Sequence, residues 1–215
     1  MKDDKKDNLA SKQASKQASK QASKDWIGDK HSVLGCLGAR NEALEEREIN
    51  DYYATQPIAA KLLIENEKLN NNIWECACGE GHLSKVFVEH GFNVKSTDLI
   101  DRGYGLGNID FLKQTEIYDG DIVTNPPYKY AQEFIEHGLT LLPEGHKLCM
   151  FLKVQFLEGK TRRKMYDKTP PKTIYVSSSR IQCGKNGVFK GSMIAYAWYV
   201  WVKGYNGATT VKWIN

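Results

Sequence analysis

Short apolar runs alternate along the chain with longer segments whose apolar residues recur at helical spacing. The runs at 73–77 and 148–152 are short and mostly apolar, which is typical of strands buried on both faces. Residues 58–67, 83–90 and 131–142 instead place their apolar side chains on one side of a helix. Strands that alternate with helices predict an α/β domain with a largely parallel sheet.

Further strands are expected at 93–98, 121–124, 173–176 and 195–202, and a last short strand ends at Trp213. The segment 195–202 reads Ala-Tyr-Ala-Trp-Tyr-Val-Trp-Val, and its aromatic and β-branched residues strongly favour a strand. These segments extend the predicted sheet almost to the end of the chain.

The N-terminal region differs from the rest of the chain. Residues 11–24 repeat Ser-Lys-Gln-Ala and contain no apolar side chain larger than Ala, so they cannot bury a core. We therefore expect a disordered low-complexity tail over 1–30, followed by an acidic helix at 41–49. The lysines of the repeat could follow a phosphate backbone, but a solvated tail is the interpretation we favour. Residues 31–215 are expected to form one domain, with a basic, substrate-facing insertion around 155–192.

Composition restricts the class of protein. The 215 residues are 41% hydrophobic and carry a formal net charge of +4, which permits nucleic-acid binding without requiring it. No run approaches the roughly 18 apolar residues of a membrane span, and the Lys/Asp-rich start is no secretory signal. A cytoplasmic protein without a membrane partner is expected, and its five cysteines then carry reduced thiols. Cys76 and Cys78 lack a second Cys/His pair to complete a zinc site, so no metal is expected.

Residues 121–128 combine a strand with a turn that no strand can continue. Pro126 and Pro127 cannot donate a backbone N–H, and Asn125 before them is held extended. The Asn125 side-chain oxygen and the Pro126 carbonyl are two converging acceptors, which suit the two hydrogens of an exocyclic or amide NH2 group. Tyr128 offers a flat ring beside them. The alternative is a proline-rich turn in which Tyr128 only packs, and the strand and the upstream glycine turn make it the weaker interpretation.

A Gly-rich turn after the strand at 73–77 indicates a nucleotide-like ligand. Gly79 and Gly81 form a tight turn before a helix, without the third glycine of a dinucleotide fingerprint. Because Glu75 precedes this turn, it suits a ligand that carries an ammonium group and no phosphate. Asp98 ends the next strand, where a carboxylate commonly accepts from ribose hydroxyls, and a role as a loop or helix cap is the alternative.

These motifs resemble those of the S-adenosylmethionine-dependent amino-methyltransferases, which methylate adenine N6 in DNA or RNA, or the glutamine amide in proteins. The Asn-Pro-Pro-Tyr turn at 125–128 is similar to their catalytic motif, and residues 75–81 to their E-x-A-C-G-x-G cofactor motif. The order of the segments over 35–214 resembles the phage-type adenine-N6 DNA methyltransferases. The resemblance implies a Rossmann-like S-adenosylmethionine-dependent methyltransferase fold, with a seven-stranded, mostly parallel sheet and an antiparallel C-terminal strand pair.

The resemblance also assigns roles to individual residues. Those implied to hold S-adenosylmethionine are Tyr53, Thr55, Glu75, Ala77, Gly79, Gly81, Asp98, Leu99, Asp110 and Phe111. Those implied to act in catalysis are Asn125, Pro126, Pro127 and Tyr128. Many enzymes of this class have Thr-Pro where Gln56 separates Thr55 from Pro57 in this chain, and Ile100 could cover the cofactor adenine in place of Leu99.

The implied reaction is direct in-line methyl transfer to an adenine that is flipped out of duplex DNA. A monomer or weak dimer is expected, located in the host cytoplasm if the gene belongs to a phage.

Basic residues accumulate at 160–190, with Tyr166, Tyr175 and Phe189 between them. A nucleic-acid groove with stacking aromatics would show this pattern. A solvated loop around the strand at 173–176 explains it equally well.

Two other functions remain open from the sequence. A methyltransferase of ribosomal-RNA adenine or of protein glutamine would use the same turn, although many such enzymes carry a separate substrate domain that is not visible in this sequence. A non-catalytic module that binds S-adenosylmethionine or coats DNA would not require the Asn-Pro-Pro-Tyr turn.

Overall fold

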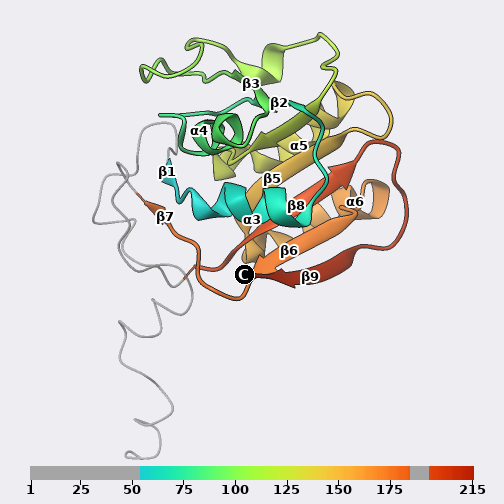
Figure 1. Ribbon diagram of the computed structural model, residues 1–215. Helices are drawn as coiled ribbons and strands as arrows, with labels where there is room; N and C mark the ends of the chain where they lie inside the picture. The colour runs from blue at the N-terminus through green and yellow to red at the C-terminus, as the bar shows by residue number, and fades with distance from the viewer. Residues whose placement is uncertain (1–53, 185–193) are drawn as a thin grey trace, which may run out of the picture. The chain divides into compact units, whose positions relative to one another are not determined.

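The computed structural model describes residues 54–184 and 194–215, in which helices cover both faces of a seven-stranded sheet (Figure 1). The strands lie in the order β3-β2-β4-β5-β8-β6-β9. Their bounds are β2 (Asn72–Glu75), β3 (Asn93–Ser96), β4 (Asp121–Thr124), β5 (Lys147–Lys153), β6 (Thr173–Ser177), β8 (Tyr196–Val202) and β9 (Thr210–Ile214). A separate two-stranded sheet pairs β1 (Ala54–Thr55) with β7 (Cys183–Gly184).

The sheet is parallel in its first half and mixed in its second. Strands β3, β2, β4 and β5 run parallel, whereas β8 is antiparallel to both β5 and β6. The predicted α/β class and the seven-stranded mixed sheet are therefore confirmed. The last two strands are not partners of each other, because β6 lies between them and pairs in parallel with β9. Burial explains this order, since β8 is apolar on both faces whereas β9 is mostly exposed and suits an edge.

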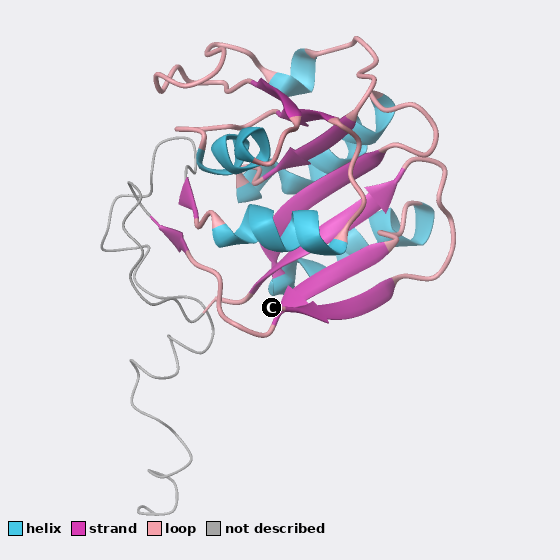
Figure 2. Cartoon of the chain, in the orientation of Figure 1, coloured by secondary structure: helices cyan, strands magenta, loops and turns pink. Residues whose placement is uncertain are grey.

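Two apolar layers enclose the sheet (Figures 1 and 2). The helices are α3 (Ile58–Asn66), α4 (His82–Glu89), α5 (Ala131–Thr140) and α6 (Lys160–Lys168). Helices α3 and α4 pack on one face, where Leu63 and Phe87 meet Val123 of β4. Helices α5 and α6 pack on the other face, where Ile135 and Met165 join the cluster around Ile122. Neighbouring residues of β4 thus serve opposite layers, as expected for a central strand.

The aromatic strand β8 fixes the middle of the sheet. Its three largest side chains are fully buried, and each polar atom has a partner. The Trp198 indole donates to the Ala59 carbonyl at 2.8 Å, and the Trp201 indole donates to the Thr169 carbonyl at 3.1 Å. The Tyr199 hydroxyl donates to the Lys153 carbonyl at 3.1 Å. These bonds allow bulky amphipathic residues to enter the core without an unsatisfied donor.

Two elements were not expected. Residues 160–168 were assigned to a basic insertion for which no helix was predicted, yet they form α6, whose only buried residue is Met165. Five of its nine residues are Lys or Arg, so the sequence shows little of the apolar pattern by which a helix that packs on a sheet is recognised. The pairing of β1 with β7 has no local signal either, because it joins Thr55 to Cys183 across most of the domain. Short 3-10 helices complete the structure: η1 (Phe111–Lys113), η2 (Tyr128–Tyr130) and η3 (Val154–Leu157).

Several predictions fall outside the described residues. They are the tail at 1–30, the acidic helix at 41–49, the cofactor residue Tyr53, and Phe189 within the basic segment. Within the described part of the chain, no helix combines the length and apolar character needed to cross a bilayer.

Candidate active site

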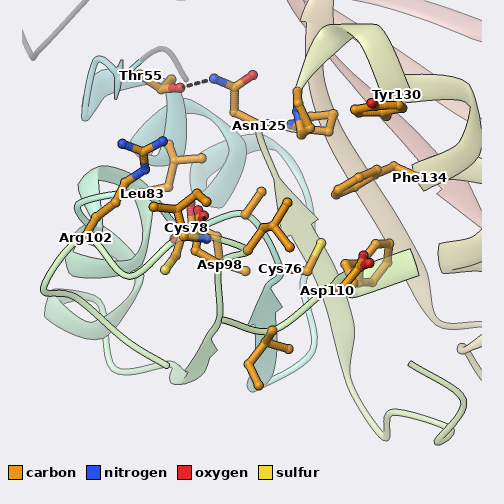
Figure 3. Close-up of a pocket in the computed structure, with 18 of the residues that line it drawn as sticks. Thr55, Cys76, Cys78, Leu83, Asp98, Arg102, Asp110, Asn125, Tyr130 and Phe134 are labelled. Carbon is orange, nitrogen blue, oxygen red and sulfur yellow. Dashed lines mark hydrogen bonds between the residues drawn. The ribbon is translucent and has the colours of Figure 1, made fainter. Parts of the chain in front are cut away.

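A cavity of about 360 Å³ lies at the carboxyl ends of β2, β3 and β4, the edge where open α/β sheets bind ligands (Figure 3). It brings together every described residue to which the sequence assigned a role, apart from Gly79 and Gly81. Those residues are Thr55, Glu75, Ala77, Asp98, Leu99, Asp110, Phe111, Asn125, Pro126, Pro127 and Tyr128. They come from five separate segments, and the parallel strands bring most of them to one edge of the sheet.

The two glycines shape the turn beside the cavity. Gly79 and Gly81 have φ values of 55° and 79°, a conformation that favours glycine. A Cβ atom on Gly81 would also collide with the ring of Tyr104. The Gly79 N–H donates to Asp98 Oδ2 at 2.8 Å, so the turn is tied to the end of β3.

Asp98 organises two backbone segments at the cavity wall. Its Oδ2 atom accepts from Gly79, and its Oδ1 atom accepts from the Ile100 N–H at 2.9 Å. Its side chain is buried, with 8% of the residue exposed. The structure therefore shows the loop-capping arrangement that the sequence left as an alternative. Each carboxylate oxygen has a second lone pair, so the same group can also accept from a ligand in the cavity.

Glu75 lies at the end of β2 and is almost fully buried. Its Oε2 atom accepts from the Ser84 hydroxyl of α4, and Ser84 also lies 2.7 Å from the Ser96 hydroxyl of β3. Burial raises the pKa of Glu75 to about 8, so the carboxyl is largely protonated at neutral pH. Glu75 thus links β2 to α4 while it also lines the cavity.

We expect the folding stability of the Glu75→Gln variant to depend less on pH than that of the native sequence between about pH 5 and pH 8. The pKa of Glu75 rises from 4.5 to about 8 on folding, so the folded state binds the extra proton in this window. The free energy of unfolding of the native sequence therefore falls as pH rises, by up to about 1.4 kcal/mol per pH unit. Urea unfolding across the window measures this slope.

The exposed Glu89 of α4 offers the matched control. Glu89→Gln should leave the slope of the native sequence unchanged. Parallel curves for Glu75→Gln and the native sequence would show that Glu75 is already ionised in the folded state.

The Asn-Pro-Pro-Tyr turn begins at Asn125, directly after β4. The Asn125 Nδ2 atom donates to Thr55 Oγ1 at 2.8 Å, which directs the amide oxygen away from Thr55 (Figure 3). Thr55 lies on β1 and was expected to contact the methionine end of a cofactor, and its bond to Asn125 was not foreseen. Pro127 has φ −59° and ψ 116° and leads into η2, where the Tyr130 N–H donates to the Pro127 carbonyl. The turn therefore presents a fixed amide beside two rigid proline rings.

Tyr128 is held on three sides. Its ring stacks on Tyr196 with centroids 5.9 Å apart and an interplanar angle of 29°. Its hydroxyl donates to Cys183 Sγ at 3.4 Å, and Lys153 Nζ lies 5.1 Å from the ring centroid. Burial raises the pKa of Tyr128 well above its usual range, so the phenol remains a donor. Tyr128 has the packing role that the sequence left open, and it also lines the cavity.

Sequence reasoning missed several residues of the cavity wall. Tyr130 follows the turn and is 42% exposed, and Phe134 of α5 was counted only as part of an apolar helix face. Arg102 and Ile109 come from the loop between β3 and η1. A residue two positions beyond an Asn-Pro-Pro-Tyr turn could have been considered. The loop residues gave no signal, because their direction depends on a backbone path without periodicity.

Comparison with known proteins identifies the fold. No protein-family model matches the sequence, and no curated protein does. A presumed class I S-adenosylmethionine-dependent methyltransferase from Listeria monocytogenes is 16% identical, with a TM-score of 0.54 over 92% of this chain and 78% of that one. A presumed RNA methyltransferase from Pyrococcus horikoshii is 14% identical, with a TM-score of 0.52 over 82% and 99%.

A third similar structure is the modification subunit of a presumed type I restriction enzyme from Vibrio vulnificus. It is 13% identical, with a TM-score of 0.51 over 82% of this chain and 49% of that one. Such low identities show a shared fold, which is the Rossmann-like fold of the S-adenosylmethionine-dependent methyltransferases.

Proposed function

We propose that the protein is an S-adenosylmethionine-dependent methyltransferase that modifies the exocyclic N6 amine of adenine in DNA. One observation carries this proposal: the Asn-Pro-Pro-Tyr turn at 125–128 opens into the same cavity as Asp98 and Asp110. A turn suited to an NH2 group thus shares a cavity with groups suited to a nucleoside.

The cavity wall fits S-adenosylmethionine. Asp98 at the end of β3 is suited to ribose hydroxyls, and Asp110 next to the buried Phe111 is suited to the amino group of an adenine. Leu99 is 50% exposed and, together with Ile100, offers an apolar cover for a purine ring. When bound, S-adenosylmethionine supplies a methyl group activated by its sulfonium.

The chain's own residues prepare the accepting amine. Thr55 accepts from the Asn125 Nδ2 atom, which directs the amide oxygen away from Thr55 and toward the position proposed for the substrate NH2 group. The Pro126 carbonyl supplies the second acceptor, and no proline N–H competes with it. Two accepted hydrogen bonds would localise the lone pair on the amine nitrogen, so that it can form a bond to the methyl carbon as the carbon–sulfur bond of the sulfonium breaks. S-adenosylhomocysteine would be the leaving group, and the excess proton of the methylated amine would pass to solvent. Positioning and polarisation provide most of the rate in such a site.

The anchored ring of Tyr128 supports a planar substrate. A side chain fixed by Tyr196 and Cys183 is oriented before the substrate arrives, so less conformational entropy is lost when a base stacks on it. Flipping an adenine out of a duplex costs a few kcal/mol, and stacking of the base on an aromatic ring offsets part of that cost.

Positive charge near the same edge of the sheet supports a nucleic-acid substrate. Helix α6 follows closely after the carboxyl end of β5, next to the strand that carries Asn125. Four of its basic residues are exposed, and one of them, Arg163, pairs with Asp167 at 2.7 Å. The other three are Lys160, where the helix begins, Lys164, and Lys168, which lies at the far end of the helix beside Val202 and Lys203, away from the cavity. Such charges suit contacts to phosphates without reading sequence.

RNA and protein glutamine are the competing substrates, because the same turn can accept any planar NH2 group. The similar structures include one described as an RNA methyltransferase and one described as a restriction-modification subunit, and their likeness rests on fold. The purified protein should therefore be incubated with methyl-labelled S-adenosylmethionine and, separately, unmethylated duplex DNA, ribosomal RNA and a protein extract. Label on DNA alone is the expected result. Label on RNA or protein alone would replace DNA as the substrate, and no label with bound cofactor would indicate a binding module.

We expect the Thr55→Val variant to slow methyl transfer about tenfold, because the Asn125 amide loses the partner that orients it. Thr55→Ser keeps the hydroxyl and should restore most of the rate. Single-turnover rates, measured beside the dissociation constant of the cofactor, separate orientation from binding. Equal losses in the Val and Ser variants would contradict this role, since a packing defect does not depend on the hydroxyl.

A further inference from the structure

Arg102 gives the cavity a feature that the assigned residues do not explain. It belongs to the loop between β3 and η1, and among the described residues that line the cavity it is the only Lys or Arg. The acidic residues of the wall are Glu75, Asp98 and Asp110. A ligand with a carboxylate would be repelled by the carboxylates of Asp98 and Asp110, and Arg102 is a group that can offset that repulsion.

The position of Arg102 distinguishes the two ends of the cavity. Figure 3 shows its guanidinium on the side of Thr55 and Leu83, whereas Asp110 and Phe134 lie on the opposite side. The side with Asp110 and Phe134 offers an acceptor and aromatic surface, which suit a purine. The side of the cavity with Arg102 therefore faces the part of such a ligand that is farthest from its purine.

The guanidinium is suited to a carboxylate. Arg102 is partly buried and its Nε atom is shielded from solvent, which strengthens its interaction with a charge in the cavity. Arg presents parallel N–H groups that bind a carboxylate with two hydrogen bonds, whereas an ammonium binds as a point charge.

We propose that Arg102 binds the α-carboxylate at the amino-acid end of S-adenosylmethionine. The inference rests on the proposed function for the identity of the ligand. It adds a specific consequence, because Arg102 then discriminates ligands that carry the carboxylate from nucleosides that lack it. A contact to a nucleic-acid phosphate is the competing role for a cation at this position, and the experiment distinguishes it.

Calorimetry on the full chain tests the proposal with four ligands. S-adenosylmethionine and S-adenosylhomocysteine carry the carboxylate, decarboxylated S-adenosylmethionine lacks only that group, and 5′-methylthioadenosine lacks the whole amino-acid end. Arg102→Ala should weaken the binding of the two ligands that carry the carboxylate by about tenfold to a hundredfold. It should change the dissociation constants of the two ligands that lack it less than twofold. Arg102→Lys should recover part of the loss. Lys61→Ala, an exposed change on α3 away from the cavity wall, should leave all four ligands unchanged.

The outcomes separate this proposal from the proposed function. If Arg102→Ala reduces the affinity for all four ligands equally, the role of Arg102 is purely structural. If it reduces the affinity for none of them, Arg102 does not contact the ligand. Either result overturns the proposal. Weaker binding to duplex DNA with unchanged S-adenosylhomocysteine binding would assign Arg102 to phosphate instead. If the native protein binds neither S-adenosylmethionine nor S-adenosylhomocysteine, the proposed function itself fails, and the role of Arg102 fails with it.

Discussion

The Asn125→Ala variant is expected to bind S-adenosylmethionine with the affinity of the native protein and to transfer its methyl group about 10²–10³-fold more slowly. The change removes the acceptor that polarises the substrate amine, whereas the carboxylates of Asp98 and Asp110 in the cofactor part of the cavity are retained. Single-turnover transfer to DNA measures the first effect, and calorimetry measures the second. The lost bond to Thr55 costs about 0.5–1.5 kcal/mol of stability, which thermal unfolding should detect without loss of the fold.

Two further variants make this result specific. Asn125→Asp retains a side-chain acceptor of the same shape, and the Thr55 hydroxyl can rotate to donate to it, so an intermediate rate is expected. Asn71→Ala changes an exposed residue before β2 and should have no effect. Native-like transfer by Asn125→Ala would exclude the proposed mechanism, and a parallel loss of cofactor binding would move Asn125 from catalysis to ligand binding.

The Asp98→Ala variant should weaken S-adenosylmethionine binding by about tenfold to a hundredfold, the effect of losing a buried charged hydrogen-bond partner. Asp98 accepts from the N–H groups of Gly79 and Ile100, so its removal releases both segments of the wall and also removes the carboxylate that we propose binds the ribose. Calorimetric titration of the cofactor gives the dissociation constant directly. The transfer rate at saturating cofactor should fall much less.

Asp101 provides the matched control for Asp98. It is exposed and does not line the cavity, and its Oδ1 atom accepts from the Gly103 N–H at 3.0 Å, so Asp101→Ala should bind the cofactor normally. Asp98→Asn keeps one acceptor but turns an NH2 group toward a backbone donor, and an intermediate loss is expected. An unchanged dissociation constant for Asp98→Ala would remove Asp98 from the cofactor site.

The cavity could be anticipated largely because parallel strands end at one edge of a sheet. Apolar runs placed the ends of β2, β3 and β4, and the residues that follow each end then had to meet. This is why Glu75, Asp98 and Asn125 line a single cavity although they are far apart in sequence. Their roles toward a ligand remain predictions, since contacts to backbone and to Ser84 explain part of their positions.

Long-range pairing could not be anticipated. The bond from Asn125 to Thr55 depends on β1, which is only two residues long and pairs with the equally short β7. The partners of Tyr128 depend on the same pairing, because Cys183 lies on β7, and on β8, which carries Tyr196. Strands β1 and β7 have two residues each, so they are too short to show a period of two in the sequence. The sequence therefore indicated the Asn-Pro-Pro-Tyr turn without the groups that orient it.

The position of β9 shows a second limit of sequence patterns. A strand ending in Trp213 was expected to pair with the aromatic strand, yet Trp213 is 73% exposed at the edge of the sheet. Its apolar character gave no information about which neighbour it would join. The pairing of β9 follows from the position of β8, whose two apolar faces require an interior place between β5 and β6. Strand β9 therefore pairs with β6 instead of with β8.

The identity of the modified nucleoside tests most directly whether the protein methylates adenine N6 in DNA. Unmethylated duplex DNA should be incubated with the protein and S-adenosylmethionine, digested to nucleosides and separated by liquid chromatography with mass detection. We expect N6-methyl-2′-deoxyadenosine with the native protein and at most a trace with Asn125→Ala. Unmodified adenine together with N4-methylcytosine, or DNA that stays unmodified while the protein binds the cofactor, would contradict this expectation.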